Sequence, residues 1–218
     1  MMEIKNIKAI LFDFDGTLVD TMGCFGEIAS ELMNKYYGLP VGEAKEKYFL
    51  TSGDPFFQQL EVLFPGDPKN HKVAEEYEKR KIKGFSSTKF PKATLEALKK
   101  IKEHHANIKL VLSSNNFQNL VDDFITRHRI DIFDLILGYR NNFSKGKEHF
   151  EHIKNHFGLQ NSELLFIGDS LSDAKRAIDN YIAFIAFMGT FSQEDWKNKY
   201  PDIVTISSIK EINDLFGE

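Results

Sequence analysis

Short apolar runs alternate with amphipathic stretches along most of the chain. Between the runs, apolar residues recur at helical spacing, as at Leu95, Leu98 and Ile101. Runs of four to six mostly apolar residues are typical of parallel strands buried on both faces; they occupy residues 7–12, 108–112, 133–137, 164–167, 182–187 and 203–206. This alternation predicts an α/β fold, a doubly wound and mostly parallel sheet.

One long segment interrupts the alternation. Residues 17–85 contain no convincing strand, but they show helical spacing, as at Phe56, Leu60 and Leu63. Turn signals built from Gly, Pro and Asp divide the segment into short helices. We therefore expect an α-helical cap domain at 17–85, inserted into a discontinuous core domain that comprises 1–16 and 86–218.

The composition of the chain argues against two classes of binding partner, nucleic acids and membranes. The chain has 218 residues and a formal net charge of −4, so it offers no broad basic field for nucleic acid. Its most apolar late stretch, residues 181–188, is too short for a membrane span. The single cysteine, Cys24, cannot form an internal disulfide. These features predict a cytoplasmic protein with neither a nucleic acid nor a membrane partner.

The sequence that carries most chemistry follows the first apolar run. There Asp13 and Asp15 are separated by one residue, and Gly16 allows a sharp turn. In a doubly wound sheet the carboxyl ends of the strands open on the ligand crevice. Two acids held close repel each other, and a Mg²⁺ ion would relieve that repulsion. The alternative is a solvated turn without a ligand.

A second acidic pair follows the run at 164–167. Gly168 precedes Asp169, and Asp173 lies four residues further on, where a helical turn would direct it back toward the strand end. Asp173 could instead be an ordinary helix cap. Because the first acidic pair is also present, we expect both pairs to converge on one cation.

Hydroxyl and amide side chains follow the run at 108–112. Ser113 is expected at the strand tip, followed by Ser114, Asn115 and Asn116. Together with free backbone N–H groups at a helix start, these residues suit a phosphoryl group. They could equally cap the following helix.

Two lysines are candidates for a cation in the crevice. Lys145 and Lys147 follow the run at 133–137 and precede a helical stretch. One lysine there could offset the charge of a carboxylate and a phosphate oxygen. We favour Lys145 because the helix is expected to begin at Gly146 and Lys147, but both stay open, and either could be a surface cation.

Taken in chain order, these motifs resemble those of the haloacid dehalogenase-like superfamily, and in particular its phosphatases with a helical cap. The phosphoglycolate phosphatase-like proteins and the β-phosphoglucomutases are the nearest groups in shape. The motifs are Asp13-x-Asp15-Gly-Thr, Ser113, Lys145 and Gly168-Asp169-Ser-x-x-Asp173. The resemblance implies a Rossmann-like core and covers essentially the whole chain.

The resemblance also implies a two-step phosphoryl transfer. Asp13 would be the nucleophile that becomes an aspartyl-phosphate. Asp15 would protonate the leaving oxygen and later take a proton from water. Ser113, Ser114 and Asn115 would bind phosphoryl oxygens, and Lys145 would do so while offsetting their charge. The frequent Gly-Lys-Pro motif of the family is absent around this lysine.

The cofactor implied by the resemblance is Mg²⁺. It would be held by Asp13, the backbone carbonyl of Asp15, Asp169 and Asp173. The expected function is Mg²⁺-dependent hydrolysis of a small phosphomonoester by a monomer or homodimer. One alternative is a sugar phosphomutase, which returns the phosphoryl group to a sugar. The other is a binding or regulatory protein that kept the fold without catalysis.

Two further patterns are interpreted as solvent-facing. His149, His152 and His156 recur at helical spacing opposite an apolar face, so we expect them on the solvated side rather than at a metal. The run from Glu75 to Lys81 mixes both signs of charge and predicts an exposed helix with internal ion pairs. Aromatic residues of the cap segment, such as Phe25, Phe56 or Phe57, are candidates to line a substrate pocket.

Overall fold

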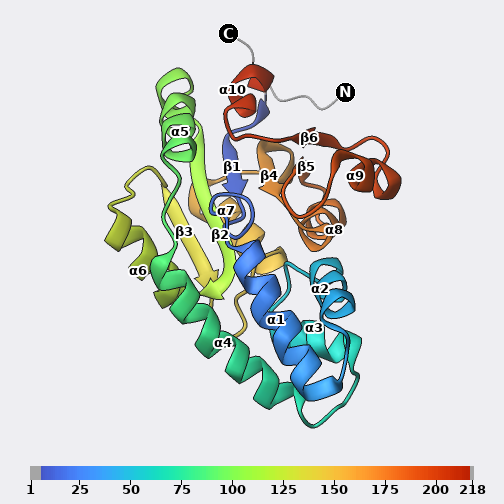
Figure 1. The fold of residues 1–218 in the computed structure, drawn as a ribbon. Helices are drawn as coiled ribbons and strands as arrows, with labels where there is room; N and C mark the ends of the chain where they lie inside the picture. Colours follow the sequence, from blue (N-terminus) through green and yellow to red (C-terminus); the bar gives the residue numbers. More distant parts are fainter. Residues whose placement is uncertain (1–5, 217–218) are drawn as a thin grey trace.

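The computed structural model describes residues 6–216 and contains one six-stranded sheet (Figure 1). All five neighbouring pairs of strands are parallel, and the spatial order is β3-β2-β1-β4-β5-β6. This confirms the predicted doubly wound parallel sheet. The strands are β1 (Ala9–Phe12), β2 (Lys109–Phe117), β3 (Leu135–Tyr139), β4 (Leu164–Gly168), β5 (Ala183–Phe187) and β6 (Val204–Ile206).

Helices cover both faces of the sheet, which explains why the strands are mostly apolar, apart from the polar end of β2. Along β1, Ile10 and Phe12 pack into one buried cluster, and Leu11 packs into another. The first cluster includes residues of α5 (Lys92–His104), α6 (Gln118–His128) and α10 (Glu211–Phe216). The second includes residues of α7 (Lys147–Phe157), α8 (Leu171–Asp179) and α9 (Gln193–Lys199). A 3₁₀ turn, η2 (Asn161–Glu163), precedes β4.

Four helices separate β1 from α5. They are α1 (Met22–Tyr37), α2 (Val41–Leu50), α3 (Phe56–Leu63) and α4 (Asn70–Ser87). Figure 1 shows them together beyond the carboxyl ends of β1 and β2. We call these four helices and their connecting loops the cap. The helical content expected at 17–85 is present, and the exact boundaries of the two domains stay a prediction.

Strand β2 is longer than expected. The sequence predicts an end at Leu112, but β2 continues to Phe117, and its register against β3 shifts between Ser113 and Phe117. Such an irregularity redirects side chains and is common beside active sites. Here it changes where Ser113 to Asn116 point. None of the helices within residues 6–216 is long and apolar enough to cross a membrane.

Candidate active site

Three aspartates converge at the carboxyl edge of the sheet. Asp13 follows β1, Asp169 follows β4, and Asp173 lies in the first turn of α8. All three are buried, and one carboxylate oxygen from each lies within 4.8 Å of the others. Three of the four aspartates in the two acidic pairs of the sequence therefore lie together.

Strand pairing brings these aspartates together. Phe12 lies opposite Ile167 in the parallel register of β1 and β4, so the residues that follow them leave the sheet side by side. The loop after β1 then passes very close to Asp169. Gly16 has a φ of 78°, and a Cβ added there would lie 2.2 Å from Asp169 Oδ2. Glycine is needed at this position both for its φ angle and for the space.

Lys145 lies among these carboxylates. Its Nζ is 2.8 Å from Asp13 Oδ1 and 2.7 Å from Asp173 Oδ1, and its side chain is only 2% exposed. Lys147 is instead exposed on the first turn of α7. Of the two candidate lysines, Lys145 is therefore the one that contacts the aspartates.

Burial gives these groups unusual pKa values. Desolvation raises the pKa of Asp13 well above its ordinary value, although Lys145 opposes this effect. Desolvation also raises the pKa of Asp169 to about 7, and the nearby charge of Asp173 adds to the shift. Burial works against the charged form of Lys145, but Asp13 and Asp173 outweigh it and raise the pKa of the lysine. The site thus holds more buried negative charge than one lysine offsets.

A divalent cation fits this set of ligands. Carboxylate oxygens are the ligands that Mg²⁺ prefers, and three of them lie close together here. A cation between them would also counter the repulsion that holds the carboxyl groups toward their neutral forms. The carboxylate of Asp15 is not one of these three.

Asp15 is instead held by two donors. The Thr21 hydroxyl donates to Asp15 Oδ1 at 2.7 Å, and the Asn116 side-chain amide donates to Asp15 Oδ2 at 2.7 Å. This carboxylate lines the pocket between the cap and the core, and it is only partly buried. It is thus separate from the three clustered aspartates but opens on the same space.

The side chain of Ser113 is placed differently from our expectation. Its hydroxyl lies 2.9 Å from His149 Nδ1, both residues are fully buried, and Ser113 is not among the residues that line the pocket. Ser114 accepts a hydrogen bond from the backbone N–H of Asn116 at 3.0 Å and also does not line the pocket. The continuation of β2 past Leu112 turns the Ser113 hydroxyl toward α7.

The prediction of a solvated His149 is wrong. The ring packs beneath Phe143, with its Nδ1 on Ser113, and burial lowers its pKa to about 3. In the helical pattern, His149 lies on the boundary between the polar and the apolar face of α7. Its burial depends on the contact with β2, which the pattern does not show. No metal role follows for it.

Asn115 joins the core to the cap. Its Oδ1 accepts a hydrogen bond from the backbone N–H of Lys145 at 2.9 Å, and its Nδ2 donates to the carbonyl of Gly53 at 2.8 Å. Gly53 lies in the loop between α2 and α3. One side chain therefore contacts both the lysine loop and the cap.

A charged contact fastens the same cap loop. Asp54 pairs with Arg176 and accepts a hydrogen bond from the Ser172 hydroxyl at 3.1 Å. Arg176 also lies 3.4 Å from Asp173, which contacts Lys145. The turn signal at Gly53-Asp54-Pro55 marked this loop in the sequence, but no pattern indicated its partner across the pocket.

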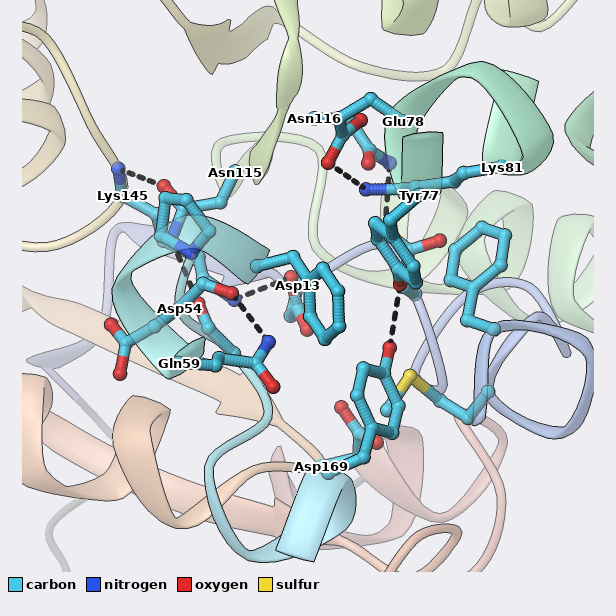
Figure 2. Close-up of a pocket in the computed structure, with 17 residues that line it drawn as sticks. Asp13, Asp54, Gln59, Tyr77, Glu78, Lys81, Asn115, Asn116, Lys145 and Asp169 are labelled. Atoms are coloured by element: carbon cyan, nitrogen blue, oxygen red, sulfur yellow. Dashed lines mark hydrogen bonds and ion pairs between the residues drawn. The ribbon is translucent and has the colours of Figure 1, made fainter. Parts of the chain in front are cut away.

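A partly open pocket lies between the cap and the aspartates (Figure 2). Core residues Asp13, Asp15, Asn115, Asn116, Lys145 and Asp169 form one side. The aromatic part of the cap side consists of Phe25, Tyr48, Phe56 and Tyr77. The pocket thus joins the acidic site to a mixed polar and aromatic surface, and it includes two of the aromatic residues proposed from the sequence.

The charged run on α4 is only partly exposed. Its internal ion pairs are present, with Lys79 Nζ 2.7 Å from Glu75 and Arg80 2.7 Å from Glu76. Lys81, however, is buried and lines the pocket together with Glu78. The prediction of an exposed run is wrong at Lys81 and at Tyr77, which is also buried, because mixed charge says nothing about what a neighbouring element covers.

Comparison with known proteins places the chain in a family. Residues 10–187 match the model of the haloacid dehalogenase-like hydrolase family, which is most of the chain. The chain belongs to this family. The predicted resemblance is thereby confirmed, and the strand ends carry the acidic motifs on which the haloacid dehalogenase-like prediction was based. A comparison with curated proteins gives no significant match.

Solved structures of haloacid dehalogenase-like proteins share the fold. A hydrolase of this family from Streptococcus pneumoniae is 22% identical with a TM-score of 0.78, covering 97% of this chain and 99% of that one. A predicted phosphatase from Clostridium acetobutylicum is 20% identical with a TM-score of 0.75, covering 96% of each chain. A predicted phosphoglycolate phosphatase from Haemophilus somnus is 19% identical with a TM-score of 0.73, covering 96% and 98%.

Proposed function

We propose that the protein is a Mg²⁺-dependent phosphatase that hydrolyses a small phosphomonoester through an aspartyl-phosphate on Asp13. The observation that carries this proposal is the buried contact of Lys145 with Asp13 and Asp173, beside Asp169. Phosphoryl transfer needs placement and positive charge more than covalent chemistry from other groups. Membership of a hydrolase family supports the same reaction class.

Asp13 and Asp15 would divide the chemistry. A carboxylate oxygen of Asp13 attacks phosphorus, and the bond from phosphorus to the ester oxygen breaks as Asp15 donates a proton to that oxygen. Water then attacks the phosphorus while Asp15 takes its proton, which releases phosphate and restores Asp13. The two hydrogen bonds that Asp15 accepts keep it oriented toward the pocket.

Cations would stabilise the transferring group. Lys145 lies on Asp13 and so offsets charge on the phosphoryl oxygens during attack. When bound, Mg²⁺ would supply further positive charge to those oxygens, with Asp13, Asp169 and Asp173 as its side-chain ligands and the Asp15 carbonyl as a fourth. Ionised carboxylates bind it best, so binding would favour the charged forms of Asp13 and Asp169.

The shape of β2 supports an assignment of the phosphate-binding residues. Asn115 lines the pocket beside Lys145, and we assign these two residues to the phosphoryl oxygens. Ser113 and Ser114 would act behind them, because their hydroxyls contact His149 and the Asn116 amide. The cap would exclude bulk water while the acyl phosphate exists.

The direct test is hydrolysis of p-nitrophenyl phosphate by the purified protein with Mg²⁺ or with EDTA. We expect turnover that requires the metal and falls by about 10³-fold or more in Asp13→Asn. Asp20→Asn is a matched control, because Asp20 is exposed outside the pocket, and it should retain activity. Unchanged activity in Asp13→Asn would contradict the proposed nucleophile.

Labelled water separates hydrolysis from the mutase alternative. Hydrolysis in H₂¹⁸O places one solvent oxygen in the released phosphate. Return of the phosphoryl group to an alcohol places none there. Absence of turnover across a broad panel of phosphomonoesters would favour a protein without catalysis.

A further inference from the structure

The pocket has a second polar end on the cap. Glu78 and Lys81 lie one turn apart on α4, and both line the pocket that contains Asp13. Figure 2 labels them with Asn116 in the part of the view away from Asp169. The proposed chemistry uses neither Glu78 nor Lys81. Their placement raises the question of what they contact when a substrate is present.

Lys81 has little to satisfy its charge. Its side chain is 11% exposed, and the nearest carboxylate oxygen described for it is Glu78 Oε1 at 3.9 Å. That distance exceeds a direct hydrogen bond. The ammonium otherwise lies over the rings of Phe25, at 5.2 Å, and Tyr77, at 5.8 Å. Within residues 6–216, no hydrogen bond of this ammonium group is found, so its three donors are available to a ligand.

Asn116 lines the same pocket and carries an acceptor without a partner among the described residues. The residue is 3% exposed, and its Oδ1 has no hydrogen-bond partner among the described residues. Its orientation is fixed because its Nδ2 donates to the carboxylate of Asp15, which can only accept when ionised. Asp15 and Glu78 also line this pocket, so the two acids and Asn116 share one space.

These three side chains favour a particular chemistry in the alcohol part of the ester. Together they offer donors from Lys81 and acceptors from Glu78 and Asn116 Oδ1. A hydroxyl group both donates and accepts, so a pair of hydroxyls can satisfy all three. A carboxylate only accepts and would face two further acceptors. An alkyl group would leave all three groups desolvated and unpaired.

We propose that Lys81, Glu78 and Asn116 select phosphomonoesters of uncharged polyols over carboxylate-bearing or alkyl esters. The inference rests on the proposed phosphatase function and names the class of its substrate. In this arrangement the ester oxygen lies near Asp15 and the hydroxyls lie toward α4.

Three probes of similar size test the selectivity of the full chain with Mg²⁺. They are glycerol 3-phosphate, n-propyl phosphate and 2-phosphoglycolate, and kcat/KM is measured for each. We expect glycerol 3-phosphate to exceed both others by about tenfold or more, because sites built on hydrogen bonds reject analogues that lack them. Equal values, or a preference for 2-phosphoglycolate, would overturn the inference.

A variant of Lys81 tests the assigned residue. Lys81→Met keeps the length of the side chain and removes its charge, so the ratio of kcat/KM for glycerol 3-phosphate to that for n-propyl phosphate should fall about tenfold. Lys83→Met is the matched control, since Lys83 is exposed on the same helix. It should leave the ratio within about twofold. Equal losses for both esters in Lys81→Met would indicate a structural role and overturn the inference.

A binding measurement separates this inference from the phosphatase proposal. Asp13→Asn is titrated calorimetrically with glycerol 3-phosphate and with n-propyl phosphate, with and without Lys81→Met. We expect about tenfold tighter binding of glycerol 3-phosphate, and we expect Lys81→Met to abolish the difference. If binding shows this preference but wild type hydrolyses no ester, only the phosphatase proposal fails. Equal binding of the two esters overturns the polyol selectivity.

Discussion

At the scale of single residues, two lysines close in sequence allow a matched comparison of a buried and an exposed position. Lys145 contacts Asp13 and Asp173 in the buried site, whereas Lys147 is exposed two residues later. We expect Lys145→Met to lower kcat/KM for p-nitrophenyl phosphate by about 10²–10³-fold, as for the loss of one group that stabilises developing charge. Lys147→Met should stay within about twofold of wild type. Similar losses in both variants would contradict the placement of Lys145.

His149 makes the stability of the fold depend on pH. Burial lowers its pKa to about 3, compared with about 6.5 in an unfolded chain. Between these values the unfolded chain binds a proton that the folded protein does not. Its contribution is therefore fully present above about pH 6.5 and is lost as pH falls toward 3.

Urea unfolding at pH 7 and pH 5 measures this effect. Between these pH values, the free energy of unfolding of wild type should fall by about 2 kcal/mol more than that of His149→Gln. Asp169 titrates in the opposite direction, but it is present in both proteins and cancels in the comparison. Equal pH dependence of the two proteins would show that His149 takes up a proton while folded.

At the scale of elements, the loop between α2 and α3 holds the cap against the core. Gly53 has a φ of 91°, and a Cβ added there would lie 2.3 Å from Ser170 Oγ. Gly53→Ala should therefore push the loop away and break the contact of its carbonyl with Asn115. We expect kcat/KM to fall by about tenfold or more, as for a small displacement near the reacting groups.

Gly42→Ala is the control for this glycine variant. Gly42 lies in α2 of the same cap, and a Cβ there would meet nothing within 4 Å. Alanine favours a helix over glycine, so we expect unchanged activity and a slight gain in stability. If Gly53→Ala also retained full activity, the loop would not need to dock for turnover.

The elements differ in how far the sequence predicts them. Strands such as Leu164–Gly168 were predictable because parallel strands buried on both faces are apolar without interruption. The motifs at the strand ends were also predictable, because their order along the chain is enough to recognise them. Contacts across the pocket do not: the helical pattern predicts α4, but the burial of Lys81 depends on which face of α4 closes over the core. The extension of β2 past Leu112 is likewise fixed by its partner strand, and no local pattern marks it.

At the scale of the whole molecule, the buried carboxylates link stability to metal. Burial raises the pKa of Asp169 to about 7, so ionising this group opposes folding as pH rises from about 4 to 7. Metal-free protein at pH 8 should thus be less stable than protein with Mg²⁺. With saturating Mg²⁺ we expect a Tm higher by several degrees, since a ligand at 100 times its Kd adds about 2.7 kcal/mol.

Asp169→Asn should reverse this behaviour in a thermal unfolding experiment. Without metal, its Tm should be at or above that of wild type, because the buried charge is removed. Its response to Mg²⁺ should be largely lost. A full Mg²⁺ response in Asp169→Asn would place the cation elsewhere.

The position of the cap along the chain has an evolutionary consequence. Strands β1 and β2 are direct neighbours, and α5 alone supplies the crossover that connects them. The path of the sheet is complete without the cap, so natural selection can lengthen, shorten or exchange the four helices without rethreading the core. Under the proposed function, changes in α1 to α4 can therefore alter substrate preference, while the residues proposed for the reaction steps stay in place at the ends of the strands.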